Sequence, residues 1–310
     1  MLLLKIELVC PFKGKKRRNK MKKRILSLAL TAVCAVSLAG CGSKNAAQTN
    51  VAEAGKDGET NVKAASGLAK EGVFVVGFDA EFPPYGYMAD DGSYTGFDLE
   101  LAEEVCKRNG WELDKKPINW DSKDMELESG LIDCIWNGFT MNGREDSYTF
   151  SEPYVDNSIV VVVSSSSDVK ALTDLSGKYV TVQADSSGLA ALEGEDATEE
   201  NKQLAASFAS LDQVADYNTA FMNLEAGSTD AVILDIGVAK YHINEKSDKF
   251  VMLDEEITSE LYAVGFKKGN DVLCNNVQET LKAMQDDGTI AKIAEKYADY
   301  NLPEMLCEFK

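Results

Sequence analysis

Hydrophobic and polar positions follow two different periods from Val73 to the C-terminus. Residues 73–78, VFVVGF, form a short apolar run typical of a buried strand. Residues 97–109 place their apolar side chains at helical spacing, and Gly110 ends that segment. Alternating strands and helices predict open α/β sheets joined by right-handed crossovers. Further strands are expected at 118–120, 132–136, 158–163, 179–183, 231–234 and 261–266, and further helices at 123–129, 220–226, 271–285 and 289–297.

One segment of this pattern occurs twice. Residues 127–137, LESGLIDCIWN, and residues 224–234, LEAGSTDAVIL, both describe a helix end, a glycine, an aspartate and a buried strand. Two similar units favour two similar lobes, and ligands of open α/β sheets bind at the carboxyl ends of strands. The first copy brings Asn137 and Gly138 to such an end, and the second brings Asp235. The alternative is coincidence, because Leu-Glu-x-Gly is also an ordinary capped helix end.

The N-terminal region carries an export pattern. Residues 21–24 include three basic side chains, residues 25–39 are mostly apolar, and Leu-Ala-Gly precedes Cys41. This layout is typical of a secretory signal, and its apolar run is too short for a membrane span. The segment before Cys41 resembles a bacterial lipobox, which implies that Cys41 is lipidated and holds the mature chain on the outer face of the cytoplasmic membrane. An ordinary cleavage site beside an incidental cysteine is the alternative.

Residues 1–20 do not fit this signal, because a signal begins with its basic segment. We therefore expect translation to start at Met21 and residues 1–20 to be a spurious extension, with the signal peptide at 21–40. Residues 41–70 are rich in small and polar residues, cannot bury a core, and are expected to form a flexible tether. No later apolar run approaches the length of a membrane span.

The charge of the chain excludes several classes of partner. Of 32 Lys and Arg and 51 Asp and Glu, ten and one respectively precede Cys41, so the mature chain has a formal charge of −28. Nucleic acid and anionic membrane surfaces repel such a chain. A solvated acidic surface is the commoner meaning of this excess, so it selects neither an acidic nor a basic small ligand.

The cysteine and histidine content argues against a metal centre. The mature chain has four cysteines besides Cys41, none with Cys-x-x-Cys spacing, and His242 is the only histidine. We therefore expect no metal site and no cofactor. An even number of cysteines in an exported protein permits disulfides, but Cys106 and Cys134 fit their apolar surroundings better as small buried residues. The four cysteines are Cys106, Cys134, Cys274 and Cys307.

Several motifs occur in order between residues 72 and 300. They are FDAEFPPY at 78–85, GFDL at 96–99, WNGFT at 136–140, an arginine at 144 with FSEPY at 150–154, DLSG at 174–177 and DAVILD at 230–235. On these motifs the chain resembles the amino-acid-binding proteins of bacterial ABC importers. The resemblance implies a two-lobe, periplasmic-binding-protein-like α/β fold of type II, with a ligand cleft between lobes joined by two hinge strands. The first lobe would comprise 71–156 and 260–303, the second 157–259, and the crossings 158–163 and 261–266.

The resemblance also implies roles for individual residues. Arg144 matches the arginine that binds the ligand carboxylate, for which a planar guanidinium is well suited. Asp235 matches the acid that accepts the ligand ammonium, unless it only caps the following helix. Asp79 matches an acid of the first lobe. Thr140 and the backbone around Ser186 and Ser187 would add donors to the carboxylate. Phe82 and Trp120 would flank the ligand side chain unless they are core residues, and Asn137, Gly138 and Gln183 complete the set.

Three features depart from the family pattern. The interval from Thr140 to Arg144 is one residue shorter than usual, although Arg144 should still reach the cleft. Asp185 stands where relatives often carry glycine, and Gln183 stands where glutamine-binding relatives carry lysine. The lysine's absence makes glutamine and glutamate less favourable ligands and leaves neutral or polar amino acids open, cystine among them.

These observations predict a lipid-anchored, monomeric receptor that captures a free L-amino acid and delivers it to an ABC permease and its ATPase. An exported amino-acid sensor is an alternative, and an enzyme on the same fold is a weaker one. The chain has no Gly-x-Ser-x-Gly or His-Glu-x-x-His motif and no second histidine to assist a nucleophile. We therefore expect no catalysis.

Overall fold

The structure is a computed structural model, and it describes residues 67–310. The predicted N-terminal extension, the signal peptide, Cys41 and most of the predicted tether lie outside the described residues. The last residues of the predicted tether contact the folded chain. Asp133 Oδ1 accepts a hydrogen bond from the amide of Ala69 at 2.8 Å, and Asn270 Nδ2 donates to the carbonyl of Gly67 at 3.0 Å.

The first lobe is built around a five-stranded sheet with the order β5-β1-β6-β13-β7. β1 (Val73–Phe78) runs parallel to β5 (Glu112–Pro117) and β6 (Cys134–Ile135). β13 (Gly265–Lys267) runs antiparallel to β6 and to β7 (Tyr148–Phe150). A strand from near the end of the chain therefore completes the sheet that the N-terminal strands begin.

The second lobe contains another five-stranded sheet, with the order β10-β9-β11-β8-β12. β9 (Tyr179–Gln183) runs parallel to β10 (Ser210–Val214) and β11 (Ala231–Asp235), whereas β8 (Val155–Ser164) runs antiparallel to β11 and β12 (Phe250–Tyr262). A small third sheet consists of β2 (Glu81–Phe82), β3 (Gly86–Met88) and β4 (Tyr94–Thr95).

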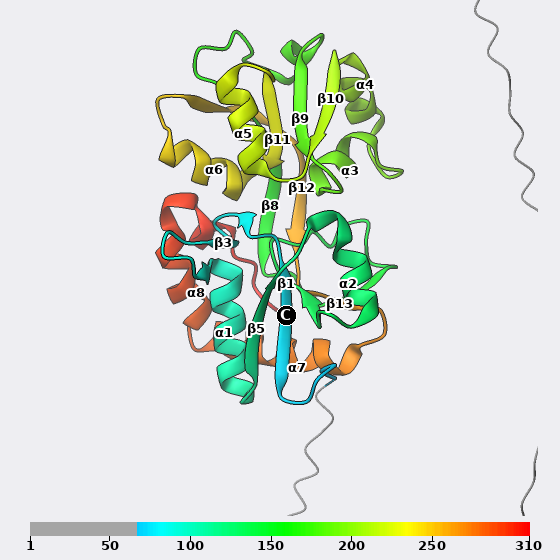
Figure 1. The fold of residues 1–310 in the computed structure, drawn as a ribbon, viewed down its shortest axis with the longest axis vertical. Coiled ribbons are helices and arrows are strands. Elements are labelled where there is room, and N and C mark those ends of the chain that lie inside the picture. The colour runs from blue at the N-terminus through cyan, green and yellow to red at the C-terminus, as the bar shows by residue number, and fades with distance from the viewer. Residues whose placement is uncertain (1–66) are drawn as a thin grey trace, which may run out of the picture. The chain divides into compact units, whose positions relative to one another are not determined.

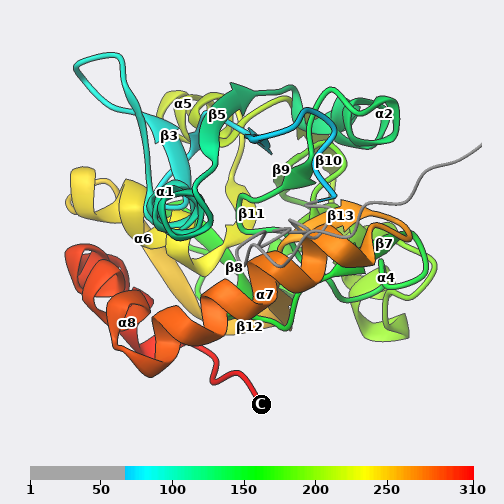
Figure 2. The ribbon, with the colours of Figure 1, turned by 90° about the horizontal axis from the view of Figure 1, so that it is seen from below.

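Helices lie against both sheets (Figure 1). In the first lobe, α1 packs against α7 and α8, and α7 runs along the underside of the lobe in Figure 2. In the second lobe, α3 packs against α4, and α5 and α6 contact β11. The helices are α1 (Phe97–Asn109), α2 (Lys123–Ser129), α3 (Ser187–Glu193), α4 (Glu199–Ser207), α5 (Tyr217–Ala226), α6 (Ile236–Glu245), α7 (Asp271–Asp286) and α8 (Thr289–Ala294).

Side chains of the central strands alternate between two apolar layers. In β1, Phe74 and Val76 belong to a large buried cluster that includes residues of α1 and α7, whereas Val75 packs against the cluster that contains Leu127 of α2. β8 alternates in the same way between the large cluster and a cluster on the α3 and α4 side. Because both faces are buried, these strands appear in the sequence as continuous apolar runs.

β8 and β12 connect the lobes. They pair antiparallel, and the pairs Val155–Tyr262 and Asn157–Glu260 continue the ladder from the second sheet toward the first lobe (Figure 1). β12 begins at Phe250, so the second crossing starts earlier than the predicted 261–266. The two-lobe α/β architecture predicted from the sequence is confirmed by the two sheets and their two connecting strands.

The predicted strand at 118–120 is wrong. The strand beside β1 is β5, and Trp120–Ser122 form a short 3-10 helix. β5 lies at the edge of its sheet and exposes charged side chains, so it has no apolar run to reveal it. The last predicted helix is also shorter than expected, because α8 ends at Ala294 and Glu295–Tyr300 continue as 3-10 helix.

The described cysteines are free thiols, and Cys106, Cys134 and Cys274 are buried, as expected for the first two. Within residues 67–310, no helix is long and apolar enough to cross a membrane. The same part of the chain has no group of His, Cys, Asp and Glu side chains arranged to hold a metal ion.

Candidate functional site

Ten of the eleven predicted ligand-binding residues line one cavity between the lobes. Its free volume is about 10 Å³, which is room for about one water molecule. An amino acid is larger, so the lobes must separate before one can enter. The lining residues are Phe82, Trp120, Asn137, Gly138, Thr140 and Arg144 from the first lobe, and Gln183, Ser186, Ser187 and Asp235 from the second.

Buried hydrogen bonds fix Asn137 and Gly138, which follow β6 after Trp136. Asn137 Oδ1 accepts from the amide of Asp79 at 2.7 Å, and the amide of Gly138 donates to Asp98 Oδ2 at 2.6 Å. Tyr154 Oη donates to the same carboxylate oxygen at 2.7 Å. Burial raises the pKa of Asp98 to about 7, although these two donors oppose the rise. Asp98 lies in the GFDL motif, but no role at the site was predicted for it.

Gly138 occupies a position that a side chain would block. Its φ is +57°, in the left-handed region that glycine adopts at least cost. A Cβ at this position would lie 2.9 Å from Phe82 Cε1 and 3.0 Å from Tyr262 Cε2. The backbone therefore approaches both aromatic rings at the cavity wall.

Asp79 is the predicted residue that does not line this cavity. Its side chain is 6% exposed, and its Oδ2 accepts a hydrogen bond of 2.7 Å from Gln183 Nε2 of the second lobe. Gln183 Nε2 also donates to the carbonyl of Ala215 at 3.0 Å. Burial is the main cause that raises the pKa of Asp79. Asp79 instead lines a neighbouring cavity of about 630 Å³, which also touches Trp120.

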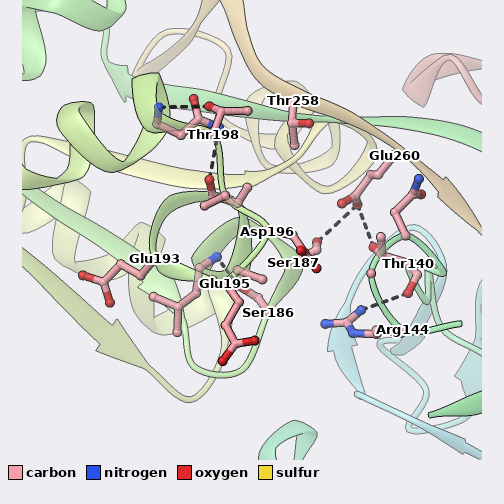
Figure 3. A pocket seen from close by; sticks show the side chains of 18 of the residues that line it. Thr140, Arg144, Ser186, Ser187, Glu193, Glu195, Asp196, Thr198, Thr258 and Glu260 are labelled. Carbon is pink, nitrogen blue, oxygen red and sulfur yellow. Dashed lines mark hydrogen bonds between the residues drawn. The ribbon is translucent and has the colours of Figure 1, made fainter. Parts of the chain in front are cut away.

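The guanidinium of Arg144 has no carboxylate within 4.0 Å among residues 67–310. Its Nη1 donates to the carbonyl of Thr140 at 3.0 Å, and its Cζ lies 5.0 Å from the centre of the Phe139 ring. Figure 3 shows Arg144 beside Thr140 at one side of a pocket of about 650 Å³. Most of its N–H groups therefore remain available to an anion.

Glu260 is a residue of the site that the sequence analysis missed. It is 5% exposed, and its Oε1 accepts hydrogen bonds from Thr140 Oγ1 at 2.8 Å and Ser187 Oγ at 3.2 Å (Figure 3). Burial raises the pKa of Glu260, and nearby donors and Arg144 oppose that rise. The only available signal was one acid immediately before a predicted strand. Thr140 and Ser187, both predicted to line the site, thus donate their hydroxyls to a carboxylate of the protein.

Asp235 lies at the end of β11, where the sequence predicted it. It occupies the N-cap position of α6, but its side chain makes no capping hydrogen bond. Asp235 Oδ1 instead accepts from Asn157 Nδ2 at 3.0 Å and from Tyr262 Oη. Burial, and then repulsion from Glu260, raise the pKa of Asp235 well above its ordinary value. The alternative role as a side-chain helix cap is therefore wrong in this structure.

The two predicted aromatic residues differ in their surroundings. Phe82 is 7% exposed, and its ring centre lies 6.0 Å from that of Tyr217 in the second lobe. Trp120 packs edge-on against Phe139, with ring centres 5.7 Å apart. Both rings line the small cavity and also pack against other aromatic rings. Each residue is therefore part of the cavity wall and of the packed interior.

An ion pair between a buried lysine and an exposed aspartate lies beside Trp120. Lys123, whose side chain is 2% exposed, pairs through Nζ with Asp185 of the second lobe and lies 5.1 Å from the Trp120 ring centre. Asp185 has a φ of +56°, in the left-handed region that glycine adopts most easily. Its interlobe partner was not visible from the sequence, because the two residues are far apart along the chain.

Known proteins with related sequences are solute-binding proteins. The family model of the bacterial extracellular solute-binding proteins, family 3, matches residues 74–300. The L-cystine-binding protein TcyJ of Escherichia coli (strain K12) is 30% identical over 236 residues, which cover 74% of this chain and 84% of that protein. The L-cystine-binding protein TcyA of Bacillus subtilis (strain 168) is 30% identical over 281 residues, which cover 89% of this chain and 97% of that protein.

Solved structures share the fold. A substrate-binding protein of an ABC uptake transporter from Streptococcus pneumoniae, with bound histidine, gives a TM-score of 0.68 at 31% identity and covers 73% of this chain and 92% of that one. An ancestral arginine-binding protein bound to glutamine gives a TM-score of 0.67 at 32% identity, covering 74% and 98%.

Proposed function

This chain belongs to family 3 of the bacterial extracellular solute-binding proteins, and from that premise we propose that its cleft binds a free amino acid for an ABC importer. The receptor closes its lobes on the ligand and delivers it to a membrane permease driven by an ATPase. It acts by binding, without catalysis, and as a monomer.

One observation carries the proposal: Arg144 and Asp235 line the same cavity from opposite lobes. An α-amino acid presents a carboxylate and an ammonium, so it needs a cationic fork and an anionic acceptor close together. In the proposed complex, the guanidinium of Arg144 binds the carboxylate in bidentate fashion. Asp235 accepts the ammonium, and Phe82 and Trp120 lie against the ligand side chain.

We propose L-cystine as the first candidate ligand. TcyJ and TcyA, each 30% identical to this chain, are named as L-cystine-binding proteins. Gln183 is a neutral amide. A cationic side chain at the same position would instead favour an acidic ligand. A cavity of about 650 Å³ shares Thr140, Arg144, Ser186 and Ser187 with the small cavity, and one of about 630 Å³ shares Trp120, which gives space for the second half of a long ligand.

We further propose that the protein is exported and held at the outer face of the cytoplasmic membrane by lipid on Cys41. The proposal rests on the signal pattern and the Leu-Ala-Gly-Cys sequence, which lie outside the described residues. The residues after Cys41 then place the lobes at a distance from the bilayer surface while they remain near a permease.

Calorimetry and scattering test the binding function together. L-cystine, L-arginine, L-histidine and L-glutamine are each titrated into the protein without its signal segment. We expect at least one to bind with micromolar affinity or better, which corresponds to about −8 kcal/mol or lower. In small-angle scattering, the radius of gyration should be no larger with that amino acid bound than without it. Failure of every amino acid to bind would contradict the proposal.

A further inference from the structure

Two buried carboxyl groups meet at one amide in the wall of the site. Asn157 Nδ2 donates to Asp235 Oδ1 at 3.0 Å and to Glu260 Oε1 at 2.9 Å. Asp235 is 3% exposed and Glu260 is 5% exposed. The pairing of β8 with β12 puts Asn157 opposite Glu260, and the pairing of β8 with β11 puts Asp235 opposite Ile159, two residues further along β8. We call Asp235 and Glu260 the carboxyl pair.

The hydrogen bonds around the carboxyl pair decide what a ligand can find there. A hydroxyl has a single O–H, and those of Thr140 and Ser187 already donate to Glu260. The hydroxyl of Tyr262 likewise donates to Asp235. In this arrangement the hydroxyl oxygens of Thr140 and Ser187 offer only lone pairs to a ligand. This part of the site therefore accepts hydrogen bonds, and it suits an ammonium better than a carboxylate.

No cationic side chain among residues 67–310 forms an ion pair with the carboxyl pair. Arg144 is close enough to Glu260 to act on its charge, but it donates to the carbonyl of Thr140. Two adjacent buried carboxylates without a bound cation repel each other strongly, and sharing one proton removes that repulsion. The titratable groups facing the pair are Arg144, Tyr85, Tyr217 and Tyr262.

We propose that Glu260 is a ligand-binding residue, that the carboxyl pair holds one proton in the ligand-free protein, and that the ligand ammonium replaces this proton. The proton leaves to solvent, the ammonium stays protonated, and no covalent bond to carbon or nitrogen changes. This inference rests on the proposed binding function. Its consequence is that binding an amino acid releases about one proton and strengthens as the pH rises.

Calorimetry in buffers with different ionisation enthalpies measures this release. Each of L-cystine, L-arginine, L-histidine and L-glutamine that binds is titrated near pH 7 in phosphate and in Tris. Wild type should release about one proton per bound amino acid, and its affinity should rise by up to about tenfold per pH unit. E260Q keeps the shape of the side chain but removes one carboxyl group, so it should release almost none and lose the pH dependence.

The control lies on the same strand. Glu256 is exposed and does not line the small cavity. Its Oε2 accepts a hydrogen bond from Ser158 Oγ at 2.9 Å. E256Q should therefore behave like wild type in both buffers. Equal proton release by wild type and E260Q, or none by wild type, would overturn the inference.

A ligand-free measurement separates this inference from the proposed function. Carbon-13 NMR of labelled carboxyl groups at pH 7 should show a protonated carboxyl in the wild type that disappears in E260Q and in D235N. If no amino acid binds but this signal is present, the binding function is wrong while the shared proton stands. If amino acids bind and the signal is absent, the shared proton is wrong.

Discussion

Asp79 of the first lobe and Gln183 of the second are joined by a hydrogen bond of 2.7 Å between Oδ2 and Nε2. Both residues were expected to contact the ligand, and here each is the other's partner across the lobes. The bond gives the buried carboxylate of Asp79 a donor, and separation of the lobes breaks it. The same groups can therefore stabilise a compact arrangement and later contact a ligand.

Gln183→Leu should favour separated lobes, because the buried carboxyl group of Asp79 would lose its interlobe donor. A buried acceptor left without a partner costs roughly 1–3 kcal/mol. We expect a larger radius of gyration for the ligand-free variant by small-angle scattering. Gln213→Leu, at an exposed position in the same lobe, is the control and should leave the scattering unchanged.

The ion pair between Lys123 and Asp185 should make ligand affinity sensitive to salt. It connects the two lobes, and the Asp185 side chain is 55% exposed, so dissolved ions can screen the pair. Raising the salt from about 0.05 to 0.5 M should weaken ligand binding by roughly threefold to tenfold in the wild type, and less in Asp185→Asn. Isothermal titration calorimetry at each salt concentration measures the ligand affinity of the wild type and of Asp185→Asn.

Lys178 supplies the control for this ion pair. It pairs with Asp168 at 2.8 Å within the second lobe, so closure does not depend on it. Lys178→Met should retain the wild-type response to salt. If Asp185→Asn also retained it, the Lys123–Asp185 pair would not contribute to closure.

Arg144→Ala should abolish most ligand affinity while the protein stays folded. The ligand carboxylate would lose its guanidinium partner in a closed cleft, a loss of roughly 3 kcal/mol or more. Calorimetry measures the affinity, and thermal unfolding checks the fold. Arg144→Lys should restore only part of the affinity, because an ammonium lacks the planar fork.

Arg108 is the matched control for this substitution. It pairs with Glu104 and Asp287 at the surface of the first lobe. Arg108→Ala should leave affinity unchanged. Near-normal binding by Arg144→Ala would instead assign the ligand carboxylate to another donor.

His242 should make stability depend on pH between about 6.5 and 4. It stacks on Phe221 with ring centres 4.0 Å apart, and burial, with a smaller effect of Lys246, lowers its pKa to about 4. As the pH falls below the unfolded pKa of about 6.5, the unfolded chain takes up a proton that the folded chain resists, so stability falls until the pH reaches about 4. The full effect is at most about 3 kcal/mol.

His242→Phe should remove this part of the pH dependence while preserving the stacked ring. Urea unfolding at several pH values measures the difference between the variant and the wild type. Tyr241→Phe, at the neighbouring position, should keep the wild-type slope. Parallel curves for wild type and His242→Phe would show that His242 does not titrate in this window.

Cys41→Ser should release the protein from membranes or leave its signal uncleaved, because a serine hydroxyl cannot replace the lipidated thiol. Membrane fractionation of the cells that express the variant tests its release. The mass of the mature chain tests whether the signal was cleaved. Cys34→Ser, inside the predicted signal, is the control and should remain membrane-bound. Unchanged fractionation of Cys41→Ser would favour the ordinary cleavage site.

Local patterns determined much of the architecture. Helices at Phe97–Asn109 and Lys123–Ser129 and strands at Val73–Phe78 and Tyr179–Gln183 lie where the sequence predicted them. Their apolar spacing and glycine ends are properties of neighbouring residues, so the sequence alone reveals them. Polar elements such as the edge strand Glu112–Pro117 were missed, because a strand bonded on one side needs no apolar run.

Motifs at the ends of β1, β6 and β11 supplied several residues of the small cavity, because the fold brings these strand ends together. Only the tertiary structure decided their partners. Glu260 and Lys123 lie in segments without any motif, and each acquires its role from a residue in another part of the chain. These hydrogen bonds and ion pairs depend on distances between residues far apart along the chain, and those distances are set by the tertiary fold, which no local pattern in the sequence records.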